Sequence, residues 1–557
     1  MNGSASGARA SGMRGGAGHG PFRTAPSRWA FRLAVLLLVA AAAFILTVFD
    51  RYGISNDEEV QHVYGRLLLD FYASGLDDRR AFEYKNLYLY GGLFDLIAAA
   101  LERLLHLDPA GARVWELRHL LSAMFGLSGL AACWMLARQL GGELAGVVAL
   151  VLLLVTGTWT GAMFTHTKDV PFAATMAWAA FFTVRVCRAL PSPPMAGVVG
   201  LGLALGCAFG LRVGAVFAVG YLGITVLALS VQERRGSVPA RLAFLRKSAV
   251  SLLPVALIAA LLAALFWPWA VMSAGNLVKA ITAFSHFSFQ LDTILDGRVM
   301  ANGEVPAHYL VSYLLVRLPE LFLLGLAFAA WVGLRTLPAL FRADGRETSC
   351  HGLPVILAAL LPLGYTLLAA PPLYNGIRHF IFLLPPLAAL AGVGLVKAWQ
   401  SAVRWPRARI AGLAGSLLLL AVHAGTLVRL HPYEYVAYNS LAGGLRGAAE
   451  RWEQDYWATS LREAAGQLNT LVAREGATGR VYTVAVCAEP FQVAVWLDPG
   501  LIVTRDWRAA DFFLSPTHMD CDGALKGQVV GKVERDGVPL AVVLDRRMLT
   551  GEARRSR

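Results

Sequence analysis

The sequence predicts an α-helical polytopic membrane protein with about eleven transmembrane helices and a small C-terminal α/β domain outside the membrane. Of its 557 residues, 56% are hydrophobic and 16% are charged, whereas soluble globular proteins carry about 25% charged residues. Apolar runs of about 20 residues, the length that crosses a bilayer, recur from residue 29 to residue 428. Basic residues gather in alternate loops between these runs, which is typical of multi-pass membrane proteins.

The N-terminal residues 1–28 are rich in Gly, Ser, Ala and Arg, and this composition predicts a disordered cytosolic tail. The apolar run that follows has a basic flank, as a signal peptide has. It is long enough to span the bilayer and shows no convincing cleavage site. We therefore expect it to be the first transmembrane helix.

Eleven apolar segments are predicted to cross the membrane. The run 195–231 is too long for one helix at about 1.5 Å per residue, so we divide it at Arg212. The segments are residues 29–49, 116–136, 145–164, 170–186, 195–211, 213–231, 249–271, 309–334, 353–370, 377–396 and 410–428.

The distribution of basic residues orients these segments. With a cytosolic N-terminus, the short outer turns contain Lys168, Arg212 and Arg378, and most other loop cations fall on the inside, as the positive-inside rule requires. An odd number of crossings then places the region after about Arg429 outside. The inner cations are Arg138, Arg185, Arg188, Arg234, Arg235, Arg241, Arg246, Lys247, Arg335, Arg342, Arg346, Lys397, Arg404, Arg407 and Arg409.

Three outer segments are substantial. The first, residues 50–115, contains two amphipathic stretches, 58–71 and 87–105, that we expect to lie along the membrane interface. The second is the polar loop 272–308. The chain thus divides into the tail, a transmembrane domain (29–430) and an extracytoplasmic domain (431–557).

The extracytoplasmic domain is predicted to be α/β. A helical stretch lies near 460–474, and strand-like runs follow at 481–486, 501–504, 511–514, 529–533 and 540–544. Asp536-Gly537 between the last two runs indicates a hairpin turn. Cys487 and Cys521 both fall in this domain, where oxidation is possible, and a disulfide between them is one hypothesis.

The outer face carries three candidate catalytic carboxylates. Asp57 and Glu58 lie in the SNDEE stretch at 55–59, directly after the first span, and Asp169 begins a later span. Each can be a helix-start residue, stabilised by the helix dipole. Each can also be a general base that deprotonates a hydroxyl group, and both interpretations stay open on spacing alone.

The same face carries four candidate anion-binding cations, Lys85, Lys168, Arg212 and Arg378. A charge at membrane depth is usually functional, although Arg212 can also reach the interface by snorkelling. A base next to such cations suits a donor activated by phosphate, because the leaving phosphate needs electrostatic stabilisation more than a general acid. A donor used outside the cytosol would be tethered to a lipid.

At this point the chain resembles the membrane glycosyltransferases of the C-type fold (GT-C). The group includes the protein O-mannosyltransferases, the aminoarabinose transferase of lipid A and related bacterial transferases of lipopolysaccharide sugars. The resemblance covers most of residues 29–430. It rests on Asp57-Glu58, the KDVP segment at 168–171, Arg212, the PAHY segment at 306–309, the YNGIRH segment at 374–379 and Pro385-Pro386.

The resemblance implies an inverting transfer from a polyprenyl-phosphate sugar to an acceptor hydroxyl of a glycan, lipid or protein. The reaction would take place on the outer face of a bacterial cytoplasmic membrane. Asp57 is the implied general base, and Lys85, Lys168, Arg212 and Arg378 are the implied phosphate ligands. The Lys85 neighbourhood lacks the Lys-Pro-Pro run common in aminoarabinose transferases. Residues that could line the site are His166, His308, Tyr309 and His379.

Whether a cofactor takes part is left open by the sequence. Asp57, Asp169 and His166 are a possible ligand set for a divalent cation. The HPYEY stretch at 431–435 and the EQDYW stretch at 453–457 are expected to pack back over the catalytic face and shape acceptor binding, or else to belong to an interfacial aromatic belt.

Two other functions remain as alternatives. A transporter or flippase of a lipid-linked or anionic solute would also carry charges among its helices, although here the charges gather at one surface. A membrane scaffold would leave this one-sided charge set unexplained. Nucleic-acid binding is disfavoured despite the net charge of +13, because the basic residues form no stripe with interleaved aromatics.

Overall fold

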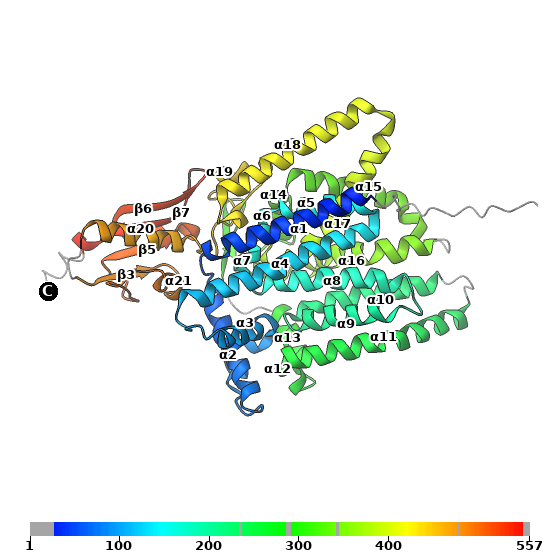
Figure 1. The fold of residues 1–557 in the computed structure, drawn as a ribbon, viewed down its shortest axis with the longest axis horizontal. Coiled ribbons are helices and arrows are strands. Elements are labelled where there is room, and N and C mark those ends of the chain that lie inside the picture. Colours follow the sequence, from blue (N-terminus) through cyan, green and yellow to red (C-terminus); the bar gives the residue numbers. More distant parts are fainter. Residues whose placement is uncertain (1–26, 233–236, 286–290, 341–344, 477–479, 550–557) are drawn as a thin grey trace, which may run out of the picture.

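The computed structural model describes residues 27–232, 237–285, 291–340, 345–476 and 480–549. A bundle of long helices makes up most of the molecule, and a small sheet lies beyond one end of it (Figure 1). The predicted fold class, a polytopic helical membrane protein with a small C-terminal sheet domain, is confirmed.

The described residues contain eight helices long and apolar enough to cross a membrane, or up to ten if each of two bent pairs is one span. The shorter apolar helix α9 adds to these, and the predicted total of eleven stays a prediction. The helices of the bundle are α1 (Arg28–Val48), α4 (Ala112–Gly141), α5 (Glu143–Leu154), α6 (Gly157–Thr160), α7 (Ala162–Thr165), α8 (Asp169–Cys187), α9 (Met195–Phe209), α10 (Val216–Val231), α11 (Val238–Phe266), α14 (Tyr309–Arg317), α15 (Glu320–Leu340), α16 (Arg346–Ala369), α17 (Leu384–Ser401) and α18 (Pro406–Leu430).

Two predicted spans are not straight helices. The segment 309–334 bends by 120° between α14 and α15. Leu318, the residue before Pro319, is extended there, because proline disfavours helical geometry in the residue that precedes it. The segment 145–164 bends by 72° after α5. Another predicted span, 249–271, begins earlier than expected, since α11 starts at Val238.

Short elements cover the end of the bundle that adjoins the sheet. In the segment 50–115 the amphipathic stretches become α2 (Glu58–Ala73) and α3 (Leu93–Leu104), with turns η1 (Phe49–Arg51), η2 (Arg80–Phe82) and η3 (Leu87–Leu89) around them. The predicted span 249–271 ends early, since α11 stops at Phe266 and α12 (Pro268–Met272) follows. The segment 272–308 contains α13 (Asn276–Ser285) and a hairpin of β1 (Asp292–Leu295) and β2 (Arg298–Ala301) that the sequence did not predict.

The sheet domain, which we define as residues 461–549, contains a five-stranded sheet in the order β4-β3-β5-β7-β6. The strand β3 is parallel to β4 and β5, whereas β7 is antiparallel to both β5 and β6. Helix α20 (Leu461–Arg474) packs on the sheet, and α21 (Phe491–Ala494) follows β3. The strands are β3 (Tyr482–Val486), β4 (Leu501–Val503), β5 (Phe512–Pro516), β6 (Gln528–Arg535) and β7 (Val538–Asp545).

Two local predictions for this domain are confirmed. Asp536 and Gly537 join β6 to β7 with φ values of 47° and 76°, the left-handed geometry that a tight hairpin of twisted strands requires. A disulfide joins Cys487, just after β3, to Cys521 in the turn η10 (His518–Gly523).

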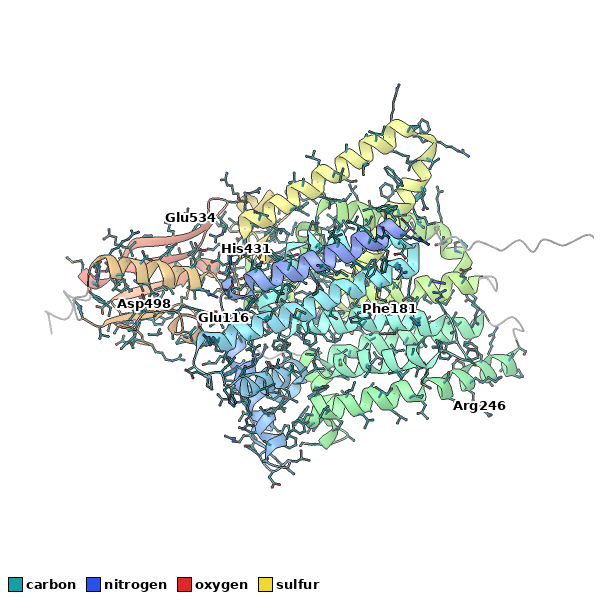
Figure 2. The ribbon with its side chains drawn as sticks, in the orientation of Figure 1. Glu116, Phe181, Arg246, His431, Asp498 and Glu534 are labelled. Atoms are coloured by element: carbon teal, nitrogen blue, oxygen red, sulfur yellow. A yellow bond between two sulfur atoms is a disulfide. The ribbon has the colours of Figure 1, made fainter. Side chains whose placement is uncertain are left out.

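The connecting segment, residues 431–460, links the bundle to the sheet domain and packs on both. Tyr438 and Trp452 belong to the apolar core of the bundle, while Tyr435 and Trp457 belong to the core shared with the sheet. The predicted domain boundary at residue 431 therefore stays a prediction. In Figure 2, His431 lies at this junction and Arg246 lies at the opposite end of the bundle.

Glycines in the bend of the segment 145–164 let the backbone of the connecting segment approach this bend closely. A Cβ at Gly157 would lie 2.2 Å from the Glu434 carbonyl oxygen, and a Cβ at Gly161 would lie 2.3 Å from the Tyr435 nitrogen. Only a residue without a side chain permits such contact between backbones. The connecting segment therefore packs directly on the backbone of the bend between α5 and α7.

Candidate active site

Four turns of the chain meet at the end of the bundle that adjoins the sheet domain. They are the start of α2, the turn between α7 and α8, the turn after α9, and the 3₁₀ turn η6 (Arg378–Leu383) before α17. These turns bring five of the predicted site residues together. We call this set the charge cluster: Asp57, Lys168, Asp169, Arg212 and Arg378.

Positive and negative side chains alternate through the charge cluster. Arg378 is the central member: its Nη2 donates to Asp57 and its Nε donates to Asp169 at 3.3 Å. Arg212 donates to the other oxygen of Asp169, and the Lys168 Nζ lies 3.9 Å from Asp57 Oδ2. Three cations therefore face two carboxylates, so the ionised cluster has an excess positive charge that an anionic ligand can neutralise.

The two carboxylates differ in access to solvent. The Asp57 side chain is 33% exposed, whereas that of Asp169 is 5% exposed. Asp57 occupies the N-cap position of α2, but its side chain makes no capping hydrogen bond and contacts Arg378 instead. Asp57 is thus the carboxylate that a substrate can reach, and Asp169 is enclosed by the two arginines.

Burial alone would raise the pKa of the Asp57 carboxyl, but the charges of Arg378 and Lys168 outweigh it and lower the pKa below its usual value. Asp57 is therefore ionised at neutral pH. Burial lowers the pKa of Lys168 to about 8, with Arg212 and Arg378 acting in the same direction and Asp57 against it. The ammonium group of Lys168 also lies 4.1 Å from the centre of the Tyr90 ring.

Glu58 points away from the charge cluster, so the structure does not support the catalytic role predicted for it. Its Oε1 accepts from the Ser55 backbone nitrogen at 2.9 Å and from the Ser55 hydroxyl at 3.0 Å, and its side chain is fully buried beside His119. Adjacent residues on a helix point about 100° apart, which separates Glu58 from Asp57. The Ser55 hydroxyl oxygen also lies 3.1 Å from the Thr165 carbonyl oxygen, so its one hydrogen is shared between two acceptors. These contacts hold the turn that carries Asp57 against the turn before Lys168.

Lys85 and His308 are likewise not brought to the cluster. Lys85 is exposed on the loop between η2 and η3, and His308 is exposed just before α14. Tyr309 is buried, and its hydroxyl accepts from the Gly376 backbone nitrogen at 3.0 Å, two residues before Arg378. Tyr309 therefore supports the turn that carries Arg378.

His166 is a buried, neutral residue close to the cluster, and its ring accepts a hydrogen bond. Its Nε2 is 2.7 Å from the Tyr456 hydroxyl and 2.9 Å from the Trp457 Nε1. Burial lowers its pKa to about 3. The ligand set considered for a divalent cation is thus engaged by other partners, and the described residues contain no group of three His, Cys, Asp or Glu that could hold a metal ion.

An apolar cavity of about 330 Å³ opens beside the cluster. Arg212 and His379 line it together with Tyr90 and Tyr374, and the remaining wall is almost entirely apolar. That wall consists of Phe172, Val213, Gly214, Val216, Phe217, Ile281, Tyr365, Pro371, Pro372, Leu373, Phe380 and Phe382. One cavity therefore offers a guanidinium group and a long apolar surface to a single ligand.

Two residues near the cluster were not predicted as site residues. Tyr90 lies under Lys168 and lines the cavity. The Trp457 ring lies over the Arg378 guanidinium, 4.0 Å from its carbon. Of the two alternatives for the EQDYW stretch, packing over this face is the one that agrees with this contact, whereas a role in acceptor binding stays a prediction. The stretch was the one sequence signal for Trp457.

Comparisons with known proteins agree with the sequence-based resemblance. Residues 110–259 match the family model of the dolichyl-phosphate-mannose-protein mannosyltransferases. This stretch includes Lys168, Asp169 and Arg212, and over it the resemblance to GT-C glycosyltransferases is confirmed. A search of curated proteins finds no match to the chain.

Several solved structures are similar in outline. ArnT from Cupriavidus metallidurans bound to undecaprenyl phosphate is 15% identical, with a TM-score of 0.44 over 91% of this chain and 97% of that one. The oligosaccharyltransferase AglB from Archaeoglobus fulgidus, in complex with an inhibitory peptide and a dolichol-phosphate, is 12% identical, with a TM-score of 0.44 over 88% and 70%. The mycobacterial arabinofuranosyltransferase AftD is 14% identical, with a TM-score of 0.40 over 94% and 40%. At such scores a likeness does not establish a shared site.

Proposed function

We propose that the protein is an inverting glycosyltransferase that moves a sugar from a polyprenyl-phosphate donor to an acceptor hydroxyl of a glycan, lipid or protein. The observation that carries this proposal is the charge cluster at the polar end of an apolar cavity. The reaction takes place at the outer face of a bacterial cytoplasmic membrane, with the N-terminus in the cytosol and the sheet domain outside.

The donor occupies the apolar cavity. Burying its isoprenoid chain against Phe172, Phe217 and Phe382 is favourable by about 25 cal/mol per Å² of apolar surface. Its phosphate lies toward Arg212, with Lys168 and Arg378 next to it in the cluster. A guanidinium group suits this task because its planar donors match the geometry of phosphate oxygens.

Asp57 is the general base. Its ionised and partly exposed carboxylate takes the proton of the acceptor hydroxyl, and the acceptor oxygen forms a bond to the anomeric carbon. The bond from that carbon to the phosphate oxygen breaks on the opposite side, and the polyprenyl phosphate leaves with the electron pair. The cations stabilise the negative charge that develops on the leaving phosphate. Asp169 holds Arg212 and Arg378 in place.

Donor binding also prepares the base. In the free protein Arg378 is engaged by Asp57, and this contact lowers the pKa of the carboxyl. A phosphate that shares the guanidinium weakens its hold on Asp57, so the carboxylate becomes more basic when a donor is present.

Blocking the cavity tests the proposal. Val216 lines the cavity and Val219, on the same helix α10, does not. Val216→Trp should weaken the binding of undecaprenyl phosphate at least roughly tenfold, because the indole takes the space of the isoprenoid. The measurement is native mass spectrometry of the detergent-purified protein titrated with this lipid. Val219→Trp should bind as the wild type does; equal affinities of both variants and the wild type would overturn the cavity assignment.

The pH dependence of donor binding tests the role of Lys168. Because the pKa of Lys168 is about 8, the residue loses its charge as pH rises through this value. Undecaprenyl phosphate should bind roughly tenfold more weakly at high pH, while the phosphate itself keeps one charge state above about pH 7. In Lys168→Arg the guanidinium stays charged, so the fall should disappear. A fall of the same size in that variant would rule out Lys168 as its cause.

A further inference from the structure

Trp457 lies in the connecting segment and contacts the charge cluster through Arg378. Its side chain is 3% exposed, and the centre of its ring lies 4.0 Å from the guanidinium carbon of Arg378. Tryptophan is the aromatic residue whose face attracts a cation most strongly. The contact therefore stabilises one particular placement of the Arg378 side chain.

The Arg378 guanidinium has two kinds of contact. Asp57 and Asp169 accept hydrogen bonds from its nitrogens, and its carbon lies over the Trp457 ring, 4.0 Å from the ring centre. The ring restricts the placement of the guanidinium beyond what the two hydrogen bonds do. Because arginine carries about 2 kcal/mol of side-chain conformational entropy, fixing the group before a ligand arrives reduces the cost of binding it.

Trp457 is itself fixed by two hydrogen bonds from different parts of the chain. Its indole N–H donates to His166 Nε2 at 2.9 Å, and its carbonyl accepts from Gln492 Nε2 at 2.9 Å. Gln492 belongs to α21 of the sheet domain and also donates to the Ile54 carbonyl at 2.7 Å. An indole N–H is only a donor, so His166 accepts with an unprotonated Nε2.

We propose that Trp457 is a positioning residue that fixes the guanidinium of Arg378 for the donor phosphate, with His166 holding the indole and Gln492 holding the backbone of Trp457 in place. This inference rests on the proposed function. It makes the connecting segment and the sheet domain part of the donor site, since neither Trp457 nor Gln492 comes from the membrane-spanning helices.

A double-mutant cycle between Trp457 and Arg378 tests the inference, with undecaprenyl phosphate as the probe. Trp457→Leu should weaken binding roughly tenfold, and Trp457→Phe, which keeps a ring face, should weaken it less. In an Arg378→Gln background, Trp457→Leu should have no further effect, because the group on which it acts is gone. Equal losses in both backgrounds would overturn the inference.

Trp452 provides a matched control. It is a buried tryptophan of the same connecting segment, and its ring packs on Tyr313 and Tyr438 instead of on Arg378. Trp452→Leu removes a similar volume and should leave binding of the probe within about twofold of the wild type. If Trp452→Leu and Trp457→Leu weaken binding alike, Trp457 acts through general packing and the inference fails.

Melting temperatures of the same four proteins without lipid separate this inference from the proposed function. A non-additive change between Trp457→Leu and Arg378→Gln shows that the two side chains act as a unit whether or not the lipid binds. Failure of the wild type to bind undecaprenyl phosphate would overturn the proposed donor, whereas additive melting temperatures would overturn the positioning role. If Trp457→Leu does not fold, Trp457→Phe takes its place in the cycle with the same criteria.

Discussion

Replacement of Asp57 by Asn should reduce sugar transfer by about 10²–10⁴-fold, the usual contribution of a general base. The amide has nearly the same shape as the carboxylate and can still accept from Arg378, but it cannot take the proton of an acceptor hydroxyl. Because Asn also removes a negative charge next to Lys168 and Arg378, undecaprenyl phosphate should bind at least as tightly as it does to the wild type.

The measurement is product formation by the purified protein with a polyprenyl-phosphate sugar, read by mass spectrometry of the glycosylated acceptor. The sugar and acceptor are first identified as the envelope glycan, lipid or protein that loses one sugar in a deletion strain. Glu59→Gln is the control, because Glu59 lies on the same first turn of α2 outside the charge cluster. If Asp57→Asn transferred sugar as fast as the wild type, Asp57 would not be the general base. Movement of substrate across a vesicle membrane without a new glycosidic bond would favour a transporter.

Replacement of Arg378 by Ala should have the second large effect, on stability and donor binding together. Arg378 is the cation that bridges the two carboxylates, and its side chain is 6% exposed. Removal of one partner from a buried ionic network typically costs about 3–5 kcal/mol. Donor binding should weaken more than acceptor binding, because the lost cation is a proposed ligand of the donor phosphate.

The same variant should also change the pH dependence of stability. In the wild type the pKa of Asp57 is lowered in the folded state, so this carboxyl contributes stability above its unfolded pKa and loses it as pH falls through the folded pKa. Without Arg378 the pKa of Asp57 rises and this contribution decreases. The difference in melting temperature between wild type and Arg378→Ala should therefore be large at neutral pH and smaller in acid.

Arg66→Ala is the control for this experiment, because Arg66 is an exposed arginine of α2. It should leave both the melting temperature and lipid binding nearly unchanged. If Arg378→Ala melts like the wild type at neutral pH, the bridge does not stabilise the protein. If it weakens donor and acceptor binding equally, Arg378 is not a specific phosphate ligand.

Much of the architecture could be predicted from the sequence, because a bilayer demands long apolar helices and these are visible in the chain. The convergence of five residues could be predicted because their loops were all assigned to the same side of the membrane. These residues are Asp57, Lys168, Asp169, Arg212 and Arg378. Residues at the same ends of neighbouring helices lie at the same depth, whatever their separation in the chain. The 120° bend before Pro319 was not predicted, although proline is a local signal, because the segment is apolar on both sides of the bend.

Other features depend on tertiary contacts that no local pattern shows. Asp57 and Glu58 are adjacent carboxylates, but they point in different directions at the start of α2. Asp57 therefore contacts Arg378, and Glu58 contacts Ser55. The role of Trp457 depends on a contact with His166 that spans 291 residues. The order of the strands, with β3 between β4 and β5, likewise depends on how the sheet assembles and not on any one strand.

The amide of Gln492 has a consequence for how such a protein could be recombined. It ties the carbonyl of Ile54, three residues before Asp57, to the carbonyl of Trp457. In a hybrid protein, the C-terminal sheet would come from another protein of equal topology. Such a hybrid would lose these two hydrogen bonds unless the other protein also carried an amide side chain at the position of Gln492. A chimaera of the two parts should therefore keep an amide side chain at position 492.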